Sequence, residues 1–156
     1  MDRDQSVSLE ITITRRFNAT PEEVFAQWID PEALKDWFAP ETYTGLSSAA
    51  DPREGGAWRV EFQAPTGERL IEHGIYKEIV PHSKLVMTLH QSFKADAPEL
   101  TILVSLEPAS GGTLMHFRQT GFVSPDHRDG VAEGWVGCMD KLAARLADDP
   151  ESVVEI

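Results

Sequence analysis

The longest periodic stretch of the chain begins at Ser124, ends at Asp149 and reads SPDHRDGVAEGWVGCMDKLAARLADD. Ser124 or Asp126 can cap a helix there, and Pro125 suits its first turn. Apolar residues recur along it at spacings of three or four: Val131, Trp135, Cys138, Leu142 and Leu146, with Met139 beside them. This periodicity predicts an amphipathic helix of about six turns, whose apolar stripe must pack against another element.

Upstream of this helix the apolar residues alternate with polar ones, which predicts strands. The alternation is found at residues 7–17, 43–49, 58–63, 68–80, 85–90, 100–106 and 113–120. Two short helices are expected after the first strand. Thr20, Pro21 and Glu23 form a capping-box start, and Asp30 with Pro31 repeats the signal before Pro40 ends the segment.

The order of elements predicts an α+β fold, because the sequence pattern lacks the strand–helix–strand alternation that is typical of a parallel sheet. We expect a curved antiparallel sheet of about seven strands around the long C-terminal helix. A sheet that grips one helix in this way leaves a concave space, so a cavity between the two is expected.

Length and composition predict a single domain over residues 7–148, with a disordered N-terminus at 1–6 and an acidic tail at 149–156. The formal net charge of −12 argues against nucleic acid and anionic membranes as partners. No apolar run is long enough to insert into a membrane, and we expect a soluble, cytoplasmic protein. The single cysteine, Cys138, is expected to be a small buried hydrophobe.

Several ordered motifs resemble a known family. They are Thr20–Phe25 (TPEEVF), Trp28–Leu34 (WIDPEAL), Trp37–Pro40 (WFAP), Asp51–Val60 (DPREGGAWRV), Gly74–Pro81 (GIYKEIVP), Gly112–Thr113 and Gly134–Trp135. Together they resemble the Hsp90-ATPase-activator homologue-like (AHSA1-like) branch of the START-like (SRPBCC, Bet v 1-like) superfamily, from about Val7 to Leu146. The resemblance implies the helix-grip fold. It implies no single activity, because relatives include lipid carriers, hormone-binding proteins, aromatic cyclases and a co-chaperone domain.

Large apolar side chains predict the lining of the cavity. The candidates are Trp37, Trp58, Phe62, Met87, Leu89, Phe117, Trp135 and Met139. Such a lining suits a hydrophobic or aromatic ligand. The alternative is a filled core, and Trp37 with Phe38 could instead form a lid or an exposed contact patch.

The strand at residues 68–80 carries the candidate catalytic residues. Its more apolar parity contains His73, which predicts that His73 points inward. A bulge at Gly74 would instead bring Glu72 and Tyr76 into the cavity. Burial would then raise the pKa of Glu72, which could serve as a general base.

The other histidines give no sign of a metal site, because their spacing matches no ligand motif. His82 and His127 are expected to be solvated. His90 and His116 are expected to face outward. We expect no metal and no cofactor.

Three functions follow from these features. The first is a non-enzymatic module that binds a hydrophobic or aromatic small molecule. The second is an enzyme of the aromatic or polyketide cyclase type, using His73 or Glu72 with Tyr76. The third is a chaperone-linked module that binds a protein partner. The sequence favours binding over catalysis and leaves the oligomeric state, monomer or homodimer, open.

Overall fold

The computed structural model describes residues 9–92, 94 and 96–147. The elements within these residues are β1 (Ile11–Phe17), α1 (Pro21–Ile29), α2 (Leu34–Trp37), β2 (Thr44–Ala50), β3 (Ala57–Gln63), β4 (Arg69–Val80), β5 (Lys84–Gln91), β6 (Leu100–Ala109), β7 (Gly112–Thr120) and α3 (Pro125–Ala147). The expected disordered N-terminus and acidic tail lie outside the described residues. Within those residues, no helix combines the length and apolar composition that crossing a bilayer requires.

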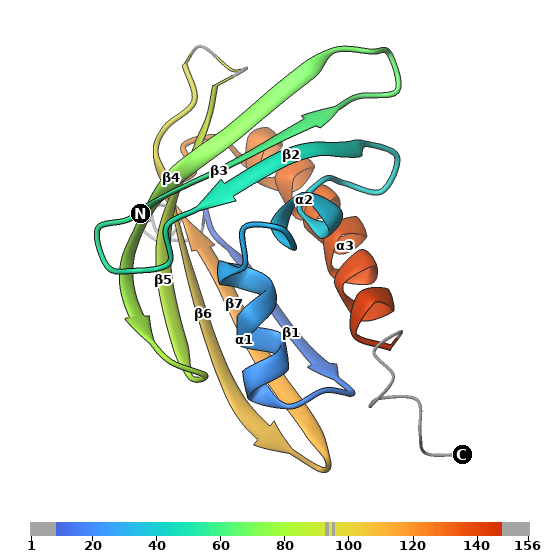
Figure 1. The fold of residues 1–156 in the computed structure, drawn as a ribbon. Helices are drawn as coiled ribbons and strands as arrows, with labels where there is room; N and C mark the ends of the chain where they lie inside the picture. The colour runs from blue at the N-terminus through green and yellow to red at the C-terminus, as the bar shows by residue number, and fades with distance from the viewer. Residues whose placement is uncertain (1–8, 93, 95, 148–156) are drawn as a thin grey trace, which may run out of the picture.

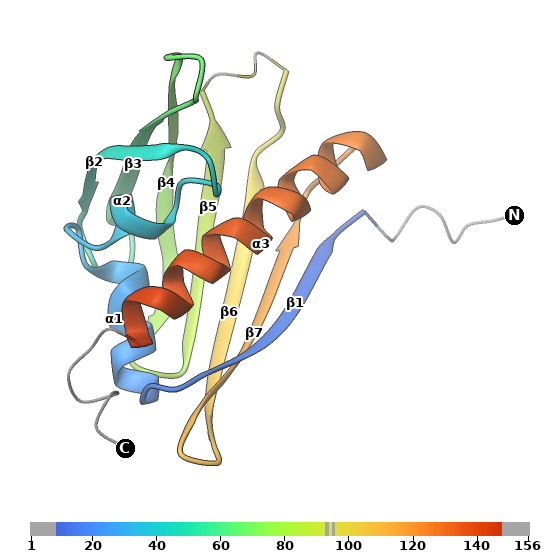
Figure 2. The same ribbon diagram turned by 90° about the vertical axis from the view of Figure 1, so that its right-hand side faces the viewer.

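The seven strands form one antiparallel sheet in the order β1-β7-β6-β5-β4-β3-β2. The sheet curls, and α3 runs diagonally across its concave side (Figure 1). Seen from the side, α3 lies in front of β5, β6 and β7, while α1 and α2 cover one end of the sheet (Figure 2). The predicted helix-grip fold is therefore confirmed.

Helix α1 begins at the predicted capping box. The Thr20 hydroxyl accepts a hydrogen bond from the Glu23 backbone N–H, and the Glu23 carboxylate accepts one from the Thr20 N–H. These two bonds satisfy backbone donors that the first turn of a helix leaves without partners. At α3 the Ser124 hydroxyl similarly accepts from the His127 N–H at 3.2 Å. Local sequence thus sets the start of both helices.

Large aromatic side chains fill the centre of the core. Trp28, Trp37, Phe38, Phe117 and Trp135 form a chain of ring contacts with centroids 4.7 to 6.3 Å apart. Trp37 is 0% and Phe38 is 2% exposed. The interpretation of these two residues as a lid or exposed patch is therefore wrong, because packing on Trp28 buries both.

The inward face of β4 differs from the prediction. His73 and Ile75 are exposed, whereas Gly74 and Tyr76 are buried and Glu72 is half-buried. The expectation that His73 points inward is wrong. The physical reason lies at Gly74, where the Trp58 indole covers the strand and donates from Nε1 to the Thr88 carbonyl at 2.9 Å.

No side chain could occupy the position of Gly74, since an added Cβ would collide with the Thr88 carbonyl oxygen and lie 2.8 Å from Trp58 Nε1. The inward-facing residues of β4 therefore look weakly apolar in the sequence, because the Trp58 indole of β3 fills the space over Gly74 that a side chain of β4 would otherwise fill. The register shift of this strand against β5 lies between Tyr76 and Glu78 and not at Gly74.

The loop between α2 and β2 is fastened to α3. The Lys141 ammonium donates to the carbonyl oxygens of Pro40 at 2.9 Å and Tyr43 at 3.0 Å, and the Cys138 thiol donates to the Phe38 carbonyl at 3.1 Å. The loop backbone approaches α3 at Gly137, which is buried. Glycine allows this close approach because it has no Cβ.

Two glycines of α3, Gly134 and Gly137, provide a matched test of this contact. An added Cβ at Gly137 would lie 2.7 Å from the Glu41 nitrogen, so Gly137→Ala should lower the free energy of unfolding by about 1–3 kcal/mol. At Gly134 the nearest atom is Pro40 Cγ at 3.5 Å, an ordinary contact, so Gly134→Ala should raise stability by up to about 1 kcal/mol. Chemical denaturation measures both. Equal effects would contradict the described loop contact.

Candidate functional site

A pocket of about 330 Å³ lies beside the N-terminal half of α3. Helix α3 supplies one wall, the loop after α2 a second, and strands β3, β4 and β5 the rest. Its lining consists of Phe38, Pro40, Tyr43, Phe62, Leu70, Glu72, Gln91, Asp126, His127, Gly130, Val131, Gly134, Trp135 and Cys138. Asp126 and Gly130 are exposed, so the pocket reaches the surface at the start of α3.

The helical spacing of α3 builds its wall. His127, Val131, Gly134 and Cys138 follow at intervals of three or four and so share one face of the helix. Val131 is only half-buried because it faces the pocket, and Gly130 and Gly134 add no side chain to fill the space. Further along, Met139, Leu142 and Leu146 are buried and close the interior.

Three polar side chains from three elements meet in the pocket. Gln91 of β5 donates from Nε2 to Glu72 Oε2 of β4 at 3.5 Å, and its Oε1 accepts from His127 Nε2 of α3 at 2.7 Å. The His127 ring also packs edge-on against Phe122, with centroids 5.4 Å apart. The expectation that His127 is solvated is therefore wrong in part, since this ring is half-buried and hydrogen-bonded.

Burial shifts the proton affinities of this set. It raises the pKa of Glu72 from 4.5 to about 7, and the hydrogen bond from Gln91 opposes the shift only in part. Burial lowers the pKa of His127, and the positive charge of Lys94 lowers it further. Burial and then the Glu72 charge raise the pKa of the Cys138 thiol. Near neutral pH the pocket thus combines a neutral imidazole, a neutral thiol and a carboxyl close to its midpoint.

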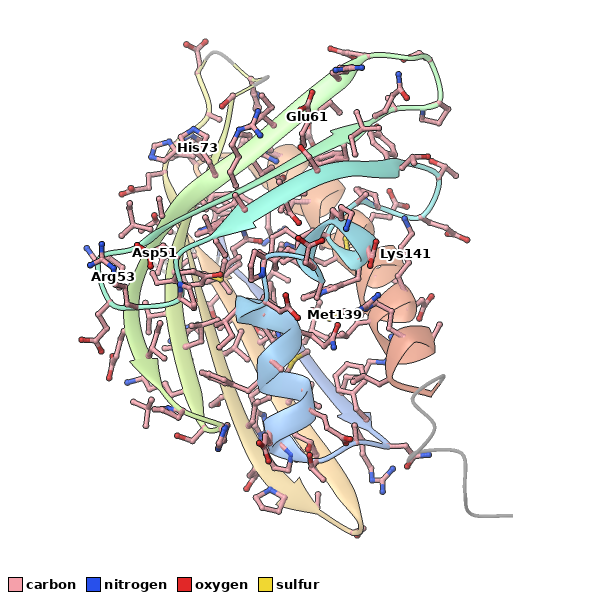
Figure 3. All side chains as sticks on the ribbon, viewed as in Figure 1. Asp51, Arg53, Glu61, His73, Met139 and Lys141 are labelled. Atoms are coloured by element: carbon pink, nitrogen blue, oxygen red, sulfur yellow. The ribbon has the colours of Figure 1, made fainter. Side chains whose placement is uncertain are left out.

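The predicted cavity lining is brought together only in part. Phe62 and Trp135 line the pocket, and the Trp135 indole is held by donation to Gln119 Oε1 at 2.7 Å. The other candidates are buried in the core and do not line this pocket: Trp37, Trp58, Met87, Leu89, Phe117 and Met139. Figure 3 places Met139 on α3 among the interior side chains.

The three candidate catalytic side chains do not converge. Glu72 lines the pocket, but the Tyr76 hydroxyl donates to the Trp28 carbonyl at 2.9 Å within the core, where burial raises its pKa. His73 lies on the outer face of the sheet, stacked on His90 at 5.5 Å, and points away from α3 (Figure 3). The proposed pairing of His73 or Glu72 with Tyr76 therefore has no shared site.

The remaining histidines match their expected positions. His82 is exposed, and His90 and His116 lie outward, where they contact the exposed carboxylates of Glu99 and Glu107. Among the described residues, no group of three His, Cys, Asp or Glu side chains is placed to hold a metal ion.

Sequence reasoning missed Gln91 and His127 as pocket residues. One signal for His127 was present, since it precedes Val131 by four residues and Trp135 by eight on the predicted helix. Gln91 gave no comparable signal. Its position depends on the register of β5 against β4, in which it pairs with Glu72.

Comparison with known proteins identifies the family. The profile of the family described as "Activator of Hsp90 ATPase homolog 1-like protein" matches residues 18–147, so the chain belongs to this family. This confirms the resemblance drawn from the ordered motifs. No curated protein matches the chain.

Solved structures show the same architecture. A protein from Chromobacterium violaceum is 28% identical, with a TM-score of 0.77, over 88% of this chain and 96% of that one. An AHSA1 protein from Silicibacter pomeroyi is 24% identical, with a TM-score of 0.78, over 90% of this chain and 99% of its own. CalU16 from Micromonospora echinospora is 23% identical, with a TM-score of 0.66, over 92% of this chain and 78% of its own. The last two show the fold alone.

The titration of Glu72 should be visible in stability. Its folded-state pKa of about 7 exceeds the ordinary 4.5, so the folded protein holds this proton more tightly than the unfolded chain. The stability that the protonated carboxyl confers is complete below about pH 4.5 and is lost by about pH 7. The difference in unfolding free energy, wild type minus Glu72→Gln, should fall by about 3 kcal/mol across that range. Denaturation at a series of pH values measures it, and a pH-independent difference would contradict the burial of Glu72.

Proposed function

We propose that this domain binds a small apolar or aromatic molecule in the pocket beside α3. The observation that supports this is the lining: Phe38, Tyr43, Phe62 and Trp135 contribute aromatic rings from three parts of the chain. The pocket volume of about 330 Å³ lies at the small end of the range for ligand sites, about 300–1,000 Å³. A molecule of one or two fused rings suits this space.

The chemistry of the lining supports binding better than the other candidate functions. A cyclase that uses Tyr76 with Glu72 or His73 would need those groups in one pocket, and only Glu72 reaches it. A protein-binding role through Trp37 and Phe38 would need exposed rings, and both are buried. Membership of a family named after an Hsp90 activator does not by itself identify another protein-binding surface on this chain.

A neutral fluorescent probe tests the proposal. Prodan (6-propionyl-2-dimethylaminonaphthalene), which has two fused rings, should bind to the wild type with a rise in fluorescence, because an apolar pocket removes the dye from water. Val131→Trp extends a pocket-lining side chain into the space and should weaken binding by at least about tenfold. Glu133→Trp is the matched control, since it places the same ring two residues away on an exposed position.

Thermal denaturation of all three proteins checks that each is folded. Absence of probe binding by the folded wild type would contradict the proposal. So would equal affinity for the wild type and Val131→Trp.

A further inference from the structure

The formally charged side chains that line the pocket are all acidic. The charged side chains that line it are Glu72, inside, and Asp126, at the exposed mouth. Cations adjoin this lining but are not part of it, and Arg128, next to His127, pairs with Asp129 at 2.9 Å. Lys141 donates to two backbone carbonyls and is absent from the lining, and Lys94 is exposed beside His127. The pocket therefore offers negative potential without a paired lysine or arginine among its described lining residues.

The Glu72 carboxylate has acceptor capacity to spare. Among the described residues, it receives one side-chain hydrogen bond, the long 3.5 Å contact from Gln91. An ionised carboxylate can accept about four hydrogen bonds, and a buried one that lacks them is costly. The imidazole Nε2 of His127 is directed to the Gln91 oxygen and not to the Glu72 carboxylate. A donor from a bound molecule would satisfy the remaining positions.

Aromatic rings surround the same space. Tyr43 packs against Phe62 with centroids 5.8 Å apart, and Phe38 packs against Trp135 at 5.3 Å. The faces of such rings attract cations, most strongly when water is excluded. A pocket with aromatic walls and one carboxylate that accepts only a single long hydrogen bond is suited to an organic cation.

We propose that the ligand of this pocket is an aromatic amine, whose ammonium group pairs with Glu72 while its ring packs between Phe62 and Trp135. This inference rests on the binding function proposed above. An anionic ligand would be repelled by Glu72 and Asp126 and would find no cation in the lining. A neutral apolar ligand would leave an ionised Glu72 without its missing donors.

The pairing should depend on pH through Glu72. The polar and titratable side chains that line the pocket with Glu72 are those of Gln91 on β5, His127 and Cys138 on α3, Asp126 at the mouth and Tyr43 on the loop. The imidazole and the thiol have pKa values shifted toward their neutral forms, so neither adds charge above neutrality. Ionisation of Glu72 near pH 7 then governs affinity for the amine.

Three ligands built on one scaffold test the proposal: 2-naphthylmethylamine, 2-naphthylmethanol and 2-naphthoate. By calorimetry at about pH 8, the amine should bind at least about tenfold more tightly than the alcohol, and the carboxylate more weakly than either. In Glu72→Gln the preference for the amine should disappear while alcohol binding is retained. Glu133→Gln removes a carboxylate at an exposed position of α3 outside the lining, and should change the amine preference by less than about threefold. At about pH 5.5 the wild-type preference should shrink, because Glu72 is then protonated.

The results separate the two proposals. If the alcohol binds as well as the amine, or the preference survives in Glu72→Gln, the amine inference is overturned and the apolar binding site remains. The same holds if the preference does not change with pH. If none of the three ligands nor the neutral probe binds to the folded wild type, both proposals fail.

Discussion

The packing of α3 across the concave sheet is the constraint on which the rest of this structure depends. Where the helix carries Met139, Leu142 and Leu146, its side chains fill the concavity. Where it carries Gly130 and Gly134 the same curvature leaves space, because the helix presents backbone and no side chain. The pocket is thus a consequence of an uneven distribution of bulk along one helix. Lys141 then fixes the second wall by holding the loop after α2.

Glu72 occupies an inward position of β4 at which an apolar residue would be expected. Its neighbours on the inward row of β4 are Leu70, Gly74 and Tyr76, all buried. Burial of a carboxyl with a single long hydrogen bond destabilises its ionised form, which is what the pKa near 7 expresses. Local conflicts of this kind concentrate at functional sites, where a ligand can relieve them. This cost is the physical reason for the proposal that Glu72 contacts the ligand.

Sequence reasoning was strong where structure is local. The capping box at Thr20 and the apolar period of α3 each depend on neighbours within a few residues, and both could be predicted. The facing of β4 could not, because the Trp58 indole from another strand occupies the space over Gly74. Likewise, the pairing of Gln91 with Glu72 depends on strand register, and period-two counting carries no information about it. The core of the site thus depended on contacts between distant segments.

A carbon-13 NMR titration of the Glu72 side-chain carboxyl, assigned by comparison with Glu72→Gln, is the most direct measurement of the central claim. That claim is that the Glu72 carboxyl lies inside an apolar pocket beside α3 and, among the described residues, has only one long side-chain hydrogen bond. The account predicts a titration midpoint near pH 7 in the folded protein. A midpoint near the ordinary value of 4.5 would show a solvated carboxyl and would contradict it.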